Sequence, residues 1–126
     1  QMSFIKSLFK SENNPKSDKP NFPWKALENE NQIAELIEES NNNPVAIFKH
    51  STRCGISRMV IKQFEKQTAN TDGASFYYLD LLQHRNISNA LASTFEITHQ
   101  SPQLILLKNG KVAAHDSHNG LLRIEI

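Results

Sequence analysis

The stretch VAIFKHSTRCGIS, residues 45–57, decides the fold. It begins with four consecutive apolar residues, 45–48, and such a run is typical of a strand buried on both faces of a sheet. A short polar loop follows, and then a helical pattern from about Cys54 to Thr68, whose apolar residues recur at helical spacing. Cys54 is therefore expected where a helix begins, just beyond the carboxyl end of a buried strand.

Strands and helices are expected to alternate on both sides of this stretch. In chain order we expect an edge strand at 23–27, a helix at 30–40, the strand at 45–48, the helix from Cys54, a strand at 76–79, a helix with Ile87, Leu91 and Phe95 that Asn86 or Ser88 caps, and strands at 104–107 and 112–114. Asn109 and Gly110 predict a type I′ hairpin between the last two strands. Alternation predicts parallel pairing through helical crossovers, and the hairpin adds an antiparallel pair. The predicted fold class is α/β, a mixed central sheet with helices on both faces.

The first 21 residues differ in composition from the rest. Residues 11–20 are polar and contain two prolines, which is typical of a linker, while four apolar residues between positions 4 and 9 could form one stripe of a short helix. We expect residues 1–21 to be a flexible N-terminal tail, with a weak surface or partner anchor as the alternative. Residues 22–126 are expected to form one domain.

Composition restricts the classes of function. Lys and Arg number 14 against 13 Asp and Glu, a balance that offers no electrostatic case for binding nucleic acid or an anionic membrane. The single cysteine excludes an internal disulfide and a thiolate zinc cage within one chain, and we expect no metal. A lone thiol suits a reducing compartment. No secretory signal or membrane span is visible, so we expect a cytoplasmic location.

A cysteine at the start of a helix is a candidate nucleophile. Unpaired backbone N–H groups and the helix dipole favour the thiolate, which is the reactive form. Arg53, Lys49 and a protonated His50 could add positive charge. The alternative is a buried, inert cysteine. Ser57, three residues after Cys54, cannot close a disulfide, so a mixed disulfide on Cys54 would need an outside thiol to resolve it.

The role of the Ser57 hydroxyl is open at this stage. It could donate a hydrogen bond to the Cys54 sulfur, or it could simply bond the backbone in the first turn of the helix. Pro102 stands just before the strand at 104–107, which we expect beside the strand at 45–48. A proline there could be cis and hold a tight loop that faces the thiol, although most prolines are trans.

These segments together resemble the thioredoxin superfamily and, more narrowly, the YtxJ-type monothiol bacilliredoxins. The resemblance is carried by KHSTRCGIS at 49–57, HQSPQ at 99–103, NGKV at 109–112 and HDSH at 115–118, within residues 24–120. Each short motif is weak alone, but their order and spacing are fairly specific. The chain departs from the family at Gly55, where a proline is common. The tail after Gly120 is also short, so the last helix should be short or absent.

The resemblance implies a thioredoxin-like fold and a monothiol thiol-disulfide oxidoreductase that removes bacillithiol, a low-molecular-weight thiol, from mixed disulfides on proteins. Cys54 would attack the mixed disulfide, and Ser57 would stand at the position of a resolving cysteine. The Ser101–Pro102 segment would be a cis-proline loop whose Ser101 backbone pairs with the bound substrate. The substrate-binding residues implied are His50, Thr52, Arg53, Gly55, Ser101 and Pro102.

The same resemblance implies bacillithiolated proteins as partners and bacillithiol as co-substrate, with no bound cofactor. The oligomeric state stays open. Two alternatives remain on the same fold: another thiol-dependent reductase, linked to glutathione or arsenate, and a thioredoxin-like binding module without redox activity.

Overall fold

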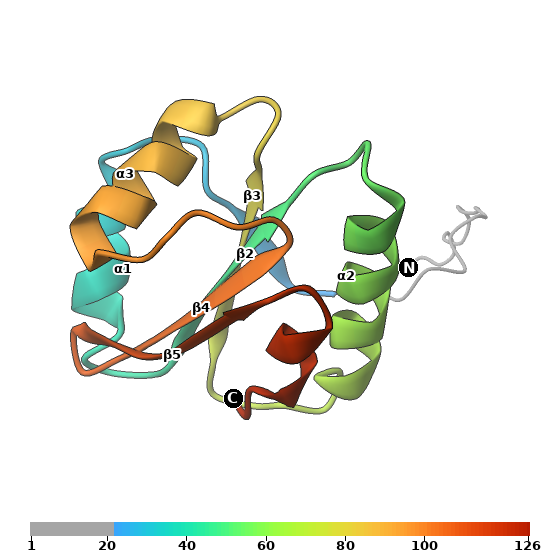
Figure 1. Cartoon of the computed structure of the whole chain (residues 1–126). Helices are drawn as coiled ribbons and strands as arrows, with labels where there is room; N and C mark the ends of the chain where they lie inside the picture. The colour runs from blue at the N-terminus through green and yellow to red at the C-terminus, as the bar shows by residue number, and fades with distance from the viewer. Residues whose placement is uncertain (1–21) are drawn as a thin grey trace, which may run out of the picture.

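The described residues, 22–126, form a five-stranded sheet with helices on both faces in a computed structural model (Figure 1). The elements are β1 (Trp24–Ala26), α1 (Gln32–Glu39), β2 (Val45–His50), α2 (Gly55–Gln67), β3 (Ser75–Asp80), α3 (Arg85–Phe95), β4 (Gln103–Lys108), β5 (Lys111–Ser117) and a 3₁₀ helix, η1 (His118–Arg123). The expected fold class is confirmed. The expected tail at 1–21 lies outside the described residues.

The strand order across the sheet is β1-β3-β2-β4-β5. The proline-led strand β1 lies at an edge, as expected, and pairs in parallel with β3, which pairs in parallel with β2. The expectation of parallel pairing is wrong for β4, which runs antiparallel to β2 and to β5. The cause is the loop at 96–102. Seven extended residues span up to about 23 Å, which is enough to run back along α3, about 16 Å long. The chain therefore returns to the end of the sheet where α3 began, and β4 starts beside the carboxyl end of β2.

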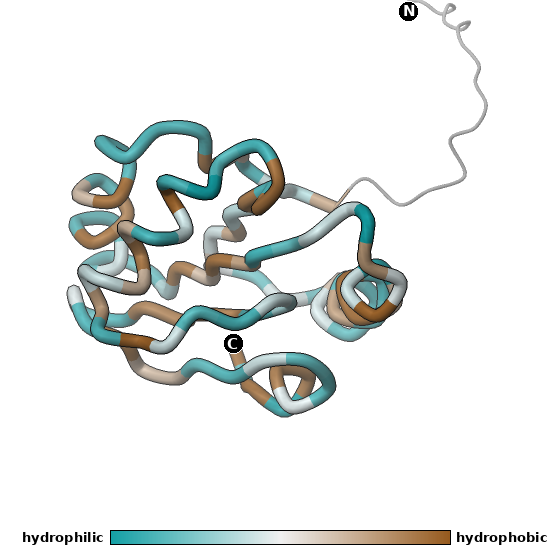
Figure 2. Tube along the Cα trace, turned by 45° about the horizontal axis from the view of Figure 1, so that its top comes forward, coloured by the Kyte–Doolittle hydropathy of each residue, from teal (hydrophilic) through white to brown (hydrophobic). Residues whose placement is uncertain are grey.

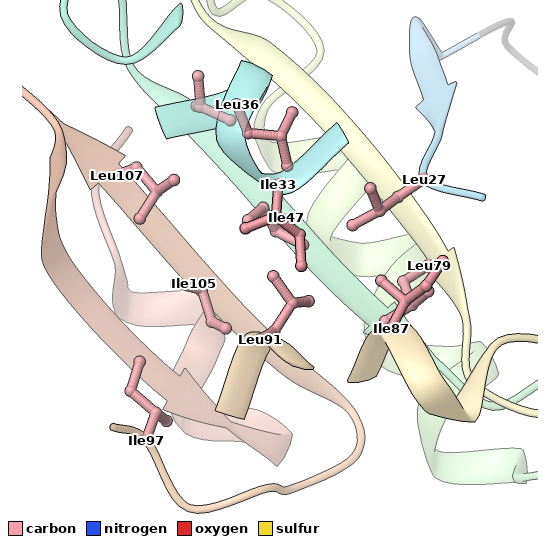
Figure 3. Close-up of a cluster of buried hydrophobic side chains, with 11 residues drawn as sticks. Leu27, Ile33, Leu36, Ile47, Leu79, Ile87, Leu91, Ile97, Ile105 and Leu107 are labelled. Carbon is pink, nitrogen blue, oxygen red and sulfur yellow. The ribbon is translucent and has the colours of Figure 1, made fainter. Parts of the chain in front are cut away.

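Two apolar clusters fill the spaces between the sheet and its two helical layers. In Figure 1, α1 and α3 lie together on one side of the sheet, and α2 with η1 on the other. Figure 3 shows the first cluster, which joins α1 and α3 to the sheet: Leu27, Ile33, Leu36, Val45, Ile47, Leu79, Ile87, Leu91, Ile97, Ile105 and Leu107. The second cluster lies under α2 and η1: Ala46, Phe48, Val60, Ile61, Phe64, Phe76, Leu104, Leu106 and Leu121. Because side chains alternate along a strand, successive residues of β2 belong to opposite clusters.

The strand β2 is longer than its apolar run. Lys49 and His50, expected in a polar loop, continue the strand, where they pair with Leu79 and Asp80 of β3, and both are buried. The strand pattern places the Lys49 side chain on the face covered by α3 and the His50 side chain on the face covered by α2. Two polar side chains thus enter the interior next to the cysteine loop.

The cap expected for α3 is wrong. The helix begins at Arg85 with His84 as its N-cap, because the Asp80 carboxylate accepts hydrogen bonds from the N–H groups of Leu82 and Gln83 and turns the chain early. The expected caps Asn86 and Ser88 have other hydrogen-bond partners. The Asn86 amide donates to a Glu30 carboxylate oxygen, and the Ser88 hydroxyl lies 3.1 Å from Nδ1 of His99.

The C-terminal elements agree with the sequence. Asn109 and Gly110 join β4 to β5 with positive φ angles of 54° and 78°, as a type I′ turn requires. The last helix is short, as expected: it is the six-residue 3₁₀ helix η1, whose Leu121 is fully buried under α2.

Candidate active site

Cys54 is the N-cap of α2, at the end of the loop that leaves the carboxyl end of β2. Its backbone is extended, with φ −99° and ψ 121°, its carbonyl accepts the Arg58 N–H at 3.0 Å, and its side chain is partly exposed. In Figure 2 the loop before it is mostly white to teal, that is, polar. The expected position at the start of the helix is confirmed. Free N–H groups of the first turn and the helix dipole therefore surround the sulfur with positive potential.

The Ser57 hydroxyl turns inward to a buried histidine. Ser57 is fully buried, its oxygen accepts the Ser51 N–H at 3.2 Å, and it lies 2.7 Å from Nδ1 of His50. Since the oxygen already accepts, the hydroxyl proton is available to the histidine nitrogen. Between the described residues, no hydrogen bond joins Ser57 to the Cys54 sulfur. Of the two roles left open by the sequence, the structure shows the backbone bond, with His50 as an additional partner.

The environment of His50 bears on the expected thiolate stabilisation. Burial lowers the pKa of His50 below its ordinary value, and this effect outweighs the attraction of the Asp80 carboxylate. His50 is therefore neutral at neutral pH and supplies a hydrogen-bonding ring rather than a charge. The expected contribution of a protonated His50 to the thiolate is wrong for this reason.

Lys49 occupies the opposite face of the sheet. Its side chain is fully buried, and its Nζ lies 3.5 Å from the carbonyl oxygen of Ser88 in α3 and 3.4 Å from Nδ1 of His99. Burial lowers the pKa of Lys49 to about 8. Burial also lowers the pKa of His99, and the Lys49 charge adds to that effect. The lysine thus links β2, α3 and the loop that precedes Pro102.

The Ser101–Pro102 peptide bond is cis, as expected. Lys49 pairs with Gln103 across β2 and β4, so this bond lies at the same end of the sheet as the loop that leads to Cys54. Pro102 is buried, whereas Ser101 is partly exposed. Between the described residues, the Ser101 backbone makes no hydrogen bond, and its buried hydroxyl oxygen has no partner. The backbone of Ser101 is therefore available to an incoming strand.

The remaining predicted site residues lie on the outer surface beside the cysteine. Thr52, Arg53 and Gly55 are all exposed. Sequence reasoning missed Arg58, whose guanidinium Nη1 donates to the Thr52 carbonyl at 3.2 Å and so closes over the loop. Its position four residues after Cys54, on the same side of the helix, is the signal that could have identified it.

Among residues 22–126, no group of three or more His, Cys, Asp or Glu side chains could hold a metal ion. None of the helices in that part of the chain is long and apolar enough to cross a membrane.

The fold and the single cysteine at the N-cap of α2 define a protein of the thioredoxin-fold, monothiol class. Residues 25–126 match the family model described as monothiol bacilliredoxin BrxC. The chain belongs to the monothiol bacilliredoxin family. The expected relationship to the YtxJ-type bacilliredoxins agrees with this match.

Solved structures support the thioredoxin fold. A protein described as a candidate oxidoreductase with a thioredoxin fold is 31% identical, with a TM-score of 0.71 over 79% of this chain and 86% of that chain. Thioredoxin O2 from Arabidopsis thaliana is 16% identical, with a TM-score of 0.65 over 82% of this chain and 90% of the other. Thioredoxin NaTrxh from Nicotiana alata is 19% identical, with a TM-score of 0.64 over 82% and 87%. The two thioredoxins support the fold alone.

Proposed function

We propose that this protein is a cytoplasmic enzyme that removes bacillithiol from mixed disulfides on other proteins. The observation that carries the proposal is the arrangement at α2: a partly exposed Cys54 at the N-cap and, one turn on, a buried hydroxyl in place of a second thiol. Membership of the monothiol bacilliredoxin family supports both a thiol-disulfide activity and the choice of bacillithiol.

The proposed reaction has two exchange steps. The Cys54 thiolate attacks the bacillithiol sulfur of the mixed disulfide, a new disulfide forms between Cys54 and bacillithiol, and the protein cysteine leaves as a thiolate that takes a proton from water. A second bacillithiol thiolate then attacks the bacillithiol sulfur on Cys54, which releases bacillithiol disulfide and restores the Cys54 thiolate. The second bacillithiol is the reductant: its thiol is oxidised to the disulfide level while the protein cysteine is reduced to a thiol, and the first bacillithiol stays in a disulfide throughout, so no bound cofactor is needed.

The other site residues have supporting roles in this proposal. Ser57 cannot resolve the adduct because a hydroxyl forms no disulfide, and its bonds to His50 and Ser51 fix the loop that positions Cys54. The free backbone of Ser101 pairs with the substrate segment in strand fashion. Thr52, Arg53 and Gly55 form the exposed surface against which the substrate lies.

The experiment is a de-bacillithiolation assay read by intact mass. The wild-type protein, mixed with a bacillithiolated protein, should acquire the mass of one bacillithiol on Cys54 and lose it when free bacillithiol is added. Cys54→Ser should be inactive, whereas Ser57→Ala should retain much of the activity because the hydroxyl is not a reactant. A matched glutathionylated substrate identifies a preference for another thiol. If Cys54 alkylates like an ordinary free thiol and carries no adduct from either substrate, the redox proposal is wrong and a binding module takes its place.

A further inference from the structure

The positive charge of the chain is concentrated around Cys54. Residues 40–64 contain four Lys or Arg and no Asp or Glu, although the whole chain has 14 against 13. Outside this stretch the balance is 10 basic to 13 acidic residues, so the rest of the protein is net acidic. The chain is nearly neutral overall, but the segment that carries the cysteine is strongly cationic.

Three of these four cations are exposed to solvent at or near the start of α2. Lys49 is buried, whereas Arg53, Arg58 and Lys62 are exposed. Arg58 is held in place by the hydrogen bond that its Nη1 donates to the Thr52 carbonyl. Its Nη2 lies beside Gly55, 3.9 Å from the position that a Cβ atom on Gly55 would occupy. The described residues form one ion pair, between Lys25 and Glu39, so none of these three cations is neutralised by a carboxylate of residues 22–126.

Apolar side chains lie among these cations. Ile56 is 55% exposed and Met59 is 73% exposed, and both belong to α2. They line a shallow hollow together with Gly55, Arg58 and Lys62. Along the helix this surface extends from residue 55 to residue 62, about 10 Å, the reach of about three residues of extended peptide. Large exposed apolar side chains rimmed by charge are typical of a protein interaction surface.

We propose that this cationic face (Arg53, Ile56, Arg58, Met59 and Lys62) docks a segment of the protein substrate that has an apolar side chain and acidic residues close to its modified cysteine. The inference rests on the proposed function, since the face borders the reacting sulfur. The apolar side chain covers Ile56 and Met59, and the carboxylates bind guanidinium and ammonium groups that form no ion pair with residues 22–126. Each exposed ion pair contributes little affinity, so the main effect is on the rate of encounter and on the choice of substrate.

The test compares two peptides that carry the same bacillithiol mixed disulfide. One has Glu and Leu beside the cysteine, and the other has Lys in place of Glu. The wild-type protein should react with the acidic peptide about tenfold faster at low salt, and high salt should remove most of that preference. Met59→Ser with Lys62→Glu should abolish or invert the preference. The control Lys108→Glu with Lys111→Glu, two exposed lysines at the β4–β5 hairpin, should leave it unchanged.

Two readouts, the rates for the two peptides and the adduct on Cys54, separate the two proposals. Equal rates for both peptides in the wild type, with a normal adduct on Cys54, would overturn the docking surface and leave the proposed function standing. A non-reactive acidic peptide, with Ser at the cysteine position, should shift the NMR methyl signals of Ile56 and Met59. If those signals move but Cys54 reacts with no disulfide, the docking surface stands and the proposed function is wrong.

Discussion

Replacing Lys49 by Met tests how the buried ammonium affects stability. Burial lowers the pKa of Lys49 from 10.5 in the unfolded chain to about 8 in the folded protein, so the unfolded chain binds more protons between these values. At pH 7 the charge therefore destabilises the fold by about 3 kcal/mol, since one pKa unit is worth about 1.4 kcal/mol. The long contacts to Ser88 and His99 offset about 2 kcal/mol of that cost.

The change in the free energy of unfolding caused by Lys49→Met should reverse its sign between pH 7 and pH 10. The cost is fully present below pH 8 and disappears as pH rises towards 10.5, so the free energy of unfolding of the wild type should rise by about 2–3 kcal/mol from pH 7 to pH 10 relative to Lys49→Met. The variant loses both the cost and the two contacts. We therefore expect Lys49→Met to be about 1 kcal/mol more stable than the wild type at pH 7 and about 1 kcal/mol less stable at pH 10.

Urea unfolding at several pH values between 7 and 10 measures this difference directly. Tyr77, whose pKa burial raises to about 12, is present in both proteins and cancels. Lys66→Met, the same substitution at an exposed position of α2, is the control and should shift stability by the same amount at every pH. A difference between wild type and Lys49→Met that stays constant from pH 7 to pH 10 would refute the reasoning.

Three further substitutions follow from the site and the core. Gly55→Pro should raise the free energy of unfolding by about 0.5–1 kcal/mol in urea titrations, because Gly55 opens α2 and Cys54 before it has the extended backbone that a following proline needs. Ser57→Ala should lower it by about 1–3 kcal/mol, since it leaves the buried Nδ1 of His50 without its partner, and an unchanged midpoint would contradict the bond. Leu121→Ala should cost about 2–5 kcal/mol in a thermal melt, and a smaller loss would show that η1 is not part of the core.

The sequence was sufficient where a pattern is local. The run at 45–48 predicts a buried strand because both faces of such a strand are covered, so that every side chain along it is apolar. The position of Cys54 follows from the helical spacing of the residues after it, and the hairpin from Asn109 and Gly110, which tolerate the positive φ angles of a type I′ turn. These features depend on neighbours in the chain and need no knowledge of tertiary contacts.

The sequence was insufficient where a polar residue finds its partner far along the chain. Lys49 and His50 have the composition of a loop, and they continue β2 only because α3, α2 and β3 supply contacts in the interior. For Lys49 these contacts come from Ser88 and His99, which are 39 and 50 residues away. The direction of β4 was missed for a similar reason. A helix between two strands predicts a crossover, and nothing local shows that the loop at 96–102 retraces the helix.

These non-local contacts explain how the site is held together. The Cys54 loop is fixed from one face of the sheet by Ser57 and His50, while on the other face Lys49 connects the same strand to α3 and to the segment before Pro102. The buried lysine reduces stability at neutral pH, but its contacts connect β2 to the segment before Pro102, while His50 of the same strand connects β2 to the start of α2. Lys49 apart, the cations of residues 40–64 are exposed, and none of them forms an ion pair with residues 22–126. In the docking proposal, these exposed charges attract an anion that approaches Cys54, such as a carboxylate of a substrate.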